Sequence, residues 1–212
     1  MPICTQILKE ELDSAFTKNS EVDLLTILKN NSILFYKLHL RKHGIQPIFA
    51  EVPFDNELRC DFCWLNDNSD GPEWVLVEIE KPNLKIFTQK GTPTSEANHA
   101  IEQVKSWRRH FEKNPDSKKR IFGAVAKFRY ILVMGSREDW QKEQTSSWRS
   151  DFNKESNIEI RSSQIFYDAL KLYTEHEEEF WSFIEHKVAR PSTQLKSFWR
   201  ESSYISQWRN II

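Results

Sequence analysis

The chain has 212 residues, which is enough for one domain with a full hydrophobic core and too few for two ordinary domains. Hydrophobic residues make up 39% of the sequence and charged residues 29%, a balance that excludes wholesale disorder. The 30 basic and 31 acidic side chains give a formal net charge of −1, which excludes a globally basic, histone-like binder but not a local basic patch. The 5 glycines form neither a Rossmann fingerprint nor a P-loop.

Membrane and secretory segments are not expected. No stretch approaches the roughly 18 uninterrupted apolar residues that a membrane span needs. Residues 1–9 also lack the apolar segment of a signal peptide. We therefore expect a cytoplasmic protein that makes no membrane contact.

The three cysteines, Cys4, Cys60 and Cys63, are an odd number without the spacing of a disulfide framework. Cys60 and Cys63 form a CxxC pair, but a zinc site would need a second ligand pair at matching spacing. Residues i and i+3 of a regular strand also point to opposite faces. We interpret Cys60 and Cys63 as ordinary core cysteines of a protein in a reducing compartment.

The first part of the chain is expected to be helical. Between residues 10 and 44, apolar side chains recur at spacings of three and four, with a break at Asn30–Asn31 and a stop at Gly44. Three segments with β-rich alternation follow, separated by turn residues, at 47–54, 58–65 and 74–80. They predict three adjacent antiparallel strands.

A long amphipathic helix is expected after these strands. It starts near Thr92 or Ser95 and ends at Asn114–Pro115, and its apolar stripe consists of Ala97, Ala100, Ile101, Val104, Trp107 and Phe111. A short strand, a helix and a second short strand follow, at 130–134, 138–153 and 158–161. Two helical segments complete the chain.

The order helix, three strands, helix, strand predicts an α/β core in which helices cover a sheet. We expect a single domain with a helical region at 1–45 packed on a core at 46–175, followed by a helical segment at 176–212. The last segment carries an apolar stripe of Leu195, Phe198, Trp199, Ile205, Trp208 and Ile212. Docking of this stripe on the chain's own core is our first interpretation, and a contact in a homo-oligomer is the alternative.

Carboxylates interrupt two of the expected strands. With regular alternation, Leu58, Cys60, Phe62 and Trp64 would face one layer and Arg59, Asp61 and Cys63 the other. In the next strand, Glu78 and Glu80 share a face. Because buried carboxylates are costly unless they are paired or bind a metal, we favour convergence of Asp61, Glu78 and Glu80 on a divalent cation, Mg²⁺ or Mn²⁺. The alternative is a solvated edge strand whose acids pair with Lys81 or Lys85.

The helix after these strands carries a polar stripe of His99, Gln103, Ser106 and His110. The amide of Gln103 can accept a hydrogen bond from a metal-bound water and donate to a phosphate or carboxylate, although an exposed surface glutamine is the alternative. We interpret His99 and His110 as surface or packing residues rather than catalytic bases.

Positive charge is concentrated in residues 105–120, which contain seven basic and two acidic side chains. We expect Lys105, Arg108, Arg109 and Lys113 to contact a nucleic-acid backbone, with a solvated helix face as the alternative. The acidic segment 175–179 is interpreted as a solvated helix face.

Three segments resemble the signature of the Shedu family: WVLVEIEKP at 74–82, FTQKGTPT at 87–94 and HAIEQVKSW at 99–107. Weaker similarity covers most of residues 20–173. The resemblance implies a bacterial anti-phage nuclease with the PD-(D/E)xK fold, and by analogy a homo-oligomer. In that case Asp61 matches the motif aspartate, Glu78 the motif acid and Gln103 the glutamine of QxxxY, with Trp107 in the place of the tyrosine.

The chain departs from this signature at Glu80, which stands where the family has its lysine, with Lys81 directly after it. A regular strand directs Lys81 away from Glu78, but Lys81 turns inward if Pro82 distorts the strand end. We expect a Mg²⁺-dependent endonuclease or nickase that hydrolyses DNA, including phage DNA, with Asp61, Glu78 and Glu80 as metal ligands. The alternative is a catalytically inactive module of the same fold that binds nucleic acid or a partner protein.

Overall fold

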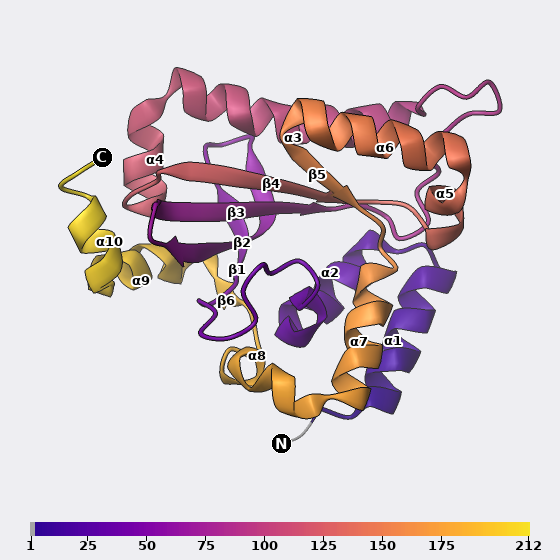
Figure 1. Ribbon diagram of the computed structural model, residues 1–212, viewed down its shortest axis with the longest axis horizontal. Helices are drawn as coiled ribbons and strands as arrows, with labels where there is room; N and C mark the ends of the chain where they lie inside the picture. The colour runs from indigo at the N-terminus through magenta and orange to yellow at the C-terminus, as the bar shows by residue number, and fades with distance from the viewer. Residues whose placement is uncertain (1–2) are drawn as a thin grey trace.

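A computed structural model describes residues 3–212, which form a six-stranded mixed sheet between two layers of helices (Figure 1). The strands are β1 (Phe49–Pro53), β2 (Arg59–Asn68), β3 (Gly71–Ile79), β4 (Lys127–Val133), β5 (Ile158–Arg161) and β6 (Arg190–Pro191). The α-helices are α1 (Thr5–Thr17), α2 (Glu21–Asn30), α3 (Ser95–Lys113), α4 (Pro115–Phe122), α5 (Arg137–Gln141), α6 (Glu143–Ser156), α7 (Ile165–Glu175), α8 (Trp181–Glu185), α9 (Leu195–Glu201) and α10 (Ser203–Trp208). Short 3-10 helices span Ser32–Phe35, Glu177–Phe180 and Ser192–Gln194.

The sheet has the strand order β5-β4-β3-β2-β1-β6. Strands β1, β2 and β3 are antiparallel neighbours, as the sequence predicts. Strand β4 returns beside β3 in parallel after α3 and α4, and β5 extends this parallel part. The α/β class and the sheet covered by helices are therefore confirmed.

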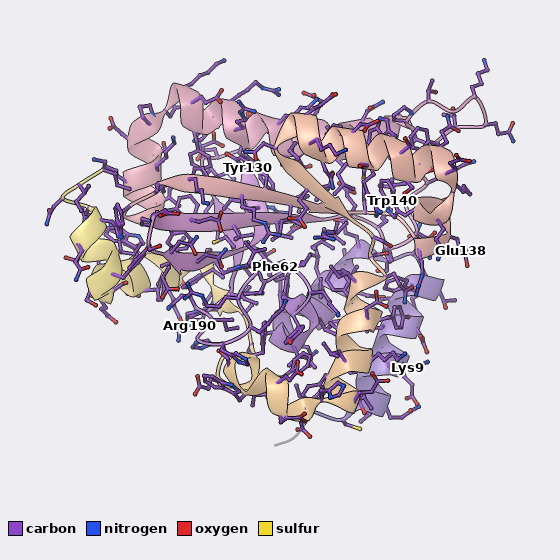
Figure 2. The ribbon with its side chains drawn as sticks, in the orientation of Figure 1. Lys9, Phe62, Tyr130, Glu138, Trp140 and Arg190 are labelled. Atoms are coloured by element: carbon purple, nitrogen blue, oxygen red, sulfur yellow. The ribbon has the colours of Figure 1, made fainter. Side chains whose placement is uncertain are left out.

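Each face of the sheet has its own hydrophobic core. In β3, Val75, Val77 and Ile79 pack toward α1, α2 and α7, whereas Trp74 and Leu76 pack toward α3, as the predicted alternation requires. Figure 2 shows Phe62 of β2 on the side of the N-terminal helices, and Tyr130 of β4 on the side of α3. A side chain at the end of β3 can thus face either layer, depending on its position along the strand.

Strand β2 does not alternate regularly, so the prediction that Cys60 shares a layer with Phe62 and Trp64 is wrong. Cys60 instead packs in the α3 layer together with Cys63. The cause is local, because Glu51 lies between residues that pair with Phe62 and Cys60 and has φ of 53°. This left-handed residue rotates the paired strands at the position of Asp61.

The helical regions differ from the predicted ones in their breaks. The expected break at Asn31 is present, and a second one separates α1 from α2 at Asn19, whose φ is 49°. The predicted end of α3 at Asn114 is confirmed, but α4 starts at once because Pro115 suits a first helical turn. The helix expected at 138–153 is divided at Lys142, whose ψ is 132°.

The C-terminal helices dock on the chain's own core, as we expected. Leu195, Trp199 and Ile205 are buried in the α3 layer. Gly123 ends α4 beneath them, and a Cβ atom there would lie 2.7 Å from the Trp199 ring. Within residues 3–212, no helix combines the length and the apolar composition that crossing a membrane requires.

Candidate active site

The candidate site lies where β2 and β3 separate. Their ladder ends at the pair Phe62 and Val77, and beyond it a carboxylate oxygen of Asp61, Oδ2, accepts a hydrogen bond of 2.8 Å from the backbone N–H of Ile79. Burial raises the pKa of Asp61 to about 7, although the Ile79 N–H and the charges of Arg59 and Lys29 oppose this shift. Ionisation of Asp61 therefore costs free energy in the folded protein.

Glu78 of β3 is the most buried carboxylate of the site, with 6% of its surface exposed. Its Oε1 atom accepts a hydrogen bond from Nε2 of Gln103 on α3, while its buried Oε2 atom has no hydrogen-bond partner among the described residues. Burial raises the pKa of Glu78 well above its ordinary value, and the nearby charges of Asp61 and Glu80 raise it further. The alternative of a solvated edge strand is thus wrong, because Glu78 is buried and β3 lies inside the sheet.

Glu80 and Lys81 lie just past the end of β3 and point in different directions. Glu80 is half-buried, and its pKa is raised to about 7 by burial and by the charges of Glu21 and Asp61. Lys81 is exposed and pairs with Glu96 at 3.5 Å. The inward turn of Lys81 considered in the sequence analysis is therefore absent.

Glu21 joins this group of acids, although the sequence analysis did not single it out. It is the first residue of α2, directly after the N-cap Ser20. Burial raises its pKa, and its charge in turn raises the pKa of Asp61, Glu78 and Glu80. An acid in the first turn of a helix is common for reasons of helix stability alone, so sequence offers no signal that Glu21 belongs to a site.

The donor set suits a hard divalent cation, because it consists of carboxylates and includes the unpartnered buried oxygen of Glu78. Within residues 3–212, however, no three His, Cys, Asp or Glu side chains lie together closely enough to hold a metal ion as they stand. Repulsion among Asp61, Glu78, Glu80 and Glu21 opposes their closer approach in the metal-free protein. The chemistry of the residues fits a magnesium-type ion, and binding it requires the carboxylates to converge.

Cys60 and Cys63 are free, buried and in the same layer. Their shared face removes the argument from strand geometry against a joint site. Their burial in the hydrophobic core agrees with the interpretation of Cys60 and Cys63 as core residues.

A groove adjoins the carboxylates. It has a volume of about 390 Å³ and is lined by Glu57, Leu58, Arg59, His99, Glu102, Gln103, Ser106 and Trp107. Gln103 connects the two features because it lines the groove and also binds Glu78. His110, the last member of the predicted polar stripe, instead approaches Asp55 at 3.0 Å.

The basic residues predicted on α3 are largely occupied by ion pairs. Lys105 and Arg109 both approach Glu102, each at 3.2 Å, and Arg108 binds Glu112 at 2.8 Å. Lys113 is exposed at the end of the helix. Arg108 and Arg109 are both exposed to solvent.

A family model described as Shedu protein SduA, C-terminal, matches residues 18–170, which is more than half of the chain. The chain belongs to the Shedu family. This membership implies a role in anti-phage defence. The carboxylates of the site and Gln103 all lie inside the part that matches the Shedu model. No curated protein matches the chain significantly.

Proposed function

We propose that this Shedu protein is a divalent-metal-dependent nuclease that cleaves DNA, phage DNA included, and that its core has the PD-(D/E)xK fold. The observation that carries the proposal is Glu78, a buried carboxylate held by Gln103 on one oxygen and unpartnered on the other. A carboxylate with this environment destabilises the folded protein by several kcal/mol unless something compensates its charge. A function that needs this carboxylate would explain why the protein contains it despite the destabilisation.

The topology supports the fold assignment. The N-terminal helices, the antiparallel β1–β3 unit, α3 and the parallel β4 follow the order that the resemblance implies. The candidate motif aspartate, Asp61, and motif acid, Glu78, are on neighbouring strands, and the helix that carries Gln103 lies over them. The family thus supplies the expected positions, and these positions lie on adjacent elements of the fold.

Asp61, Glu78 and Glu80 would hold Mg²⁺ or Mn²⁺, with Glu21 as a further nearby carboxylate. A bound ion supplies a water of lowered pKa and neutralises charge that develops on the phosphate. Gln103 fixes one oxygen of Glu78, and the Ile79 N–H fixes one oxygen of Asp61. These two hydrogen bonds limit the orientations of Asp61 and Glu78, and the carboxylates would still have to converge around the ion.

A catalytically inactive module that binds DNA is the second candidate function. It is favoured by the separation of the carboxylates and by Glu80 at the lysine position. Both candidates use the same fold, but only the nuclease needs a functional metal site. Metal binding therefore distinguishes them.

Glu78→Gln tests the proposal because it removes the charge and keeps the shape. We expect the original chain to bind Mn²⁺ in a calorimetric titration and to cleave DNA only with Mg²⁺ or Mn²⁺. Glu78→Gln should weaken metal binding and lower cleavage by about 100-fold or more. A matched control is Glu138→Gln, an exposed acid on α5 (Figure 2), which should change neither quantity.

Two results would decide against the nuclease. Cleavage by Glu78→Gln at the original rate would remove this site from the chemistry. DNA binding by the original chain without metal binding or cleavage would favour the inactive module.

A further inference from the structure

Arg59 occupies an unusual position beside the candidate active site. It is exposed on β2, two residues before Asp61, and it forms part of the wall of the groove that Gln103 also lines. Within residues 3–212 its guanidinium forms no ion pair and no hydrogen bond. The basic residues of α3 on the same side of the sheet are different, because Lys105, Arg108 and Arg109 each bind a carboxylate.

The charge of Arg59 acts directly on the acids of the site. It lowers the pKa of Asp61, Glu78 and Glu21 against the stronger effect of burial. Lys81, a basic side chain just past the end of β3, is exposed and paired with Glu96. Arg59 thus lines the groove and acts on the carboxylates, and it has no partner among residues 3–212.

The two acidic residues of the groove wall, Glu57 and Glu102, do not prevent an anion from binding in the groove. Glu102 is paired with both Lys105 and Arg109, which offset its negative charge. Glu57 lies in the exposed turn between β1 and β2. At the inner end of the groove, Gln103 connects to Glu78. A chain of phosphates that reached Glu78 through this groove would pass Arg59.

We infer that the groove between α3 and the β1–β2 turn binds a phosphodiester of DNA next to the one at the carboxylates, with Arg59 as its phosphate-binding residue. This inference rests on the proposed function for the position of the cleaved bond. A guanidinium binds two phosphate oxygens at once, which a lysine ammonium does with less geometric definition. Arg59 also supplies positive charge at a site where Glu80 replaces the family's lysine.

The test is DNA affinity without metal, so that binding is measured separately from cleavage. A labelled DNA duplex is titrated in EDTA at five salt concentrations with the original chain, Arg59→Gln and Arg59→Lys. The matched control is Lys196→Gln, which removes one exposed positive charge from α9. Thermal unfolding of each variant verifies that it is folded.

Arg59→Gln should bind about tenfold more weakly, the effect of one lost charge-assisted hydrogen-bonded contact. The slope of log affinity against log salt should become shallower by about 0.9, because one phosphate contact is lost. Arg59→Lys keeps the charge, so the slope should not change. Its affinity should fall about threefold, because the bidentate contact of the guanidinium is lost. Lys196→Gln should match the original chain in both quantities.

The inference would be overturned if folded Arg59→Gln bound DNA with the affinity and slope of the original chain. It would also be overturned if Lys196→Gln lost as much affinity as Arg59→Gln. If Arg59→Gln unfolds, Arg59→Lys decides: reduced affinity with the original slope supports the inference, and unchanged affinity overturns it. The proposed function fails separately, when Glu78→Gln cleaves DNA as the original chain does. Weaker binding by Arg59→Gln in that case would still support a DNA phosphate site in the groove.

Discussion

At the scale of single residues, the site is defined by carboxylates that the fold stabilises in their protonated forms. Burial raises the pKa of Asp61 and of Glu80 to about 7 each, and Glu78 is shifted in the same direction. Each acid makes ionisation of the others harder. The metal-free protein therefore stores an electrostatic cost at this point, which a bound cation would relieve.

Asp61→Asn should stabilise the metal-free protein at pH 8. The folded pKa of Asp61 is about 7 against an ordinary 3.8, so between about pH 4 and pH 7 the unfolded chain releases a proton that the folded chain retains. Stability consequently falls as pH rises through this window and levels off above it. At pH 8 the variant should melt about 5 °C higher in EDTA.

The melting difference between Asp61→Asn and the original chain should shrink toward pH 4, because Asp61 is protonated in the folded chain and the pH there approaches the ordinary pKa of 3.8 of the unfolded chain. Thermal scans from pH 4 to pH 8 measure this. Added Mg²⁺ should raise the melting temperature of the original chain more than that of the variant. An equal difference at all pH values would contradict an electrostatic origin.

At the scale of elements, the end of β3 determines which side chains enter the site. Glu78 faces α3 in phase with Trp74 and Leu76, as the alternation of the strand requires. Glu80, just past the strand end, is half-buried and interacts with the charges of Asp61 and Glu21, whereas Lys81 is exposed and pairs with Glu96. Glu80, and not Lys81, therefore belongs to the acidic group.

Glu80→Ala should lower metal-dependent DNA cleavage by about 100-fold. Lys81→Ala removes only an exposed ion pair with Glu96, whose contribution to stability is about 0–1 kcal/mol, and should leave cleavage within about twofold. Initial rates at saturating DNA and Mg²⁺ compare the two variants. The reverse order would show that Lys81 turns inward in the working enzyme.

At the scale of the whole molecule, two cores hold the sheet, and the chain's last helices complete one of them. Trp199 packs on Gly123 at the end of α4, and its ring nitrogen donates to the carbonyl of Ile121 at 2.9 Å. The glycine is required there because its φ is 80° and a Cβ would collide with the Trp199 ring. The C-terminal helices are thus part of the folding unit.

Trp199→Ala should destabilise the protein by about 3–5 kcal/mol, because it leaves a cavity and removes a buried hydrogen bond. Chemical denaturation followed by circular dichroism measures the loss. The matched control is Trp181→Ala, since Trp181 is 48% exposed and should cost less than about 1 kcal/mol. Equal losses in the two variants would contradict the docked arrangement.

The sequence by itself determined the features that depend on neighbours along the chain. Alternation in β3 gave the phase of Glu78, and apolar spacing gave the stripe of α3 together with the position of Gln103. The signature motifs indicated the Shedu family, which the match over residues 18–170 shows. These features follow from local periodicity and residue type, which the sequence displays directly.

Tertiary structure alone decided the features that depend on residues far apart in the chain. The left-handed Glu51 reversed the expected phase around Cys60, and packing of α2 against the sheet added Glu21 to the acids. Ion pairs on α3 occupied Lys105, Arg108 and Arg109, three of the four basic residues that the sequence predicted to contact nucleic acid, while Arg59 was left without an ion pair. The physical reason is that charge pairing, burial and strand rotation are set by neighbours in space, which the order of residues does not reveal.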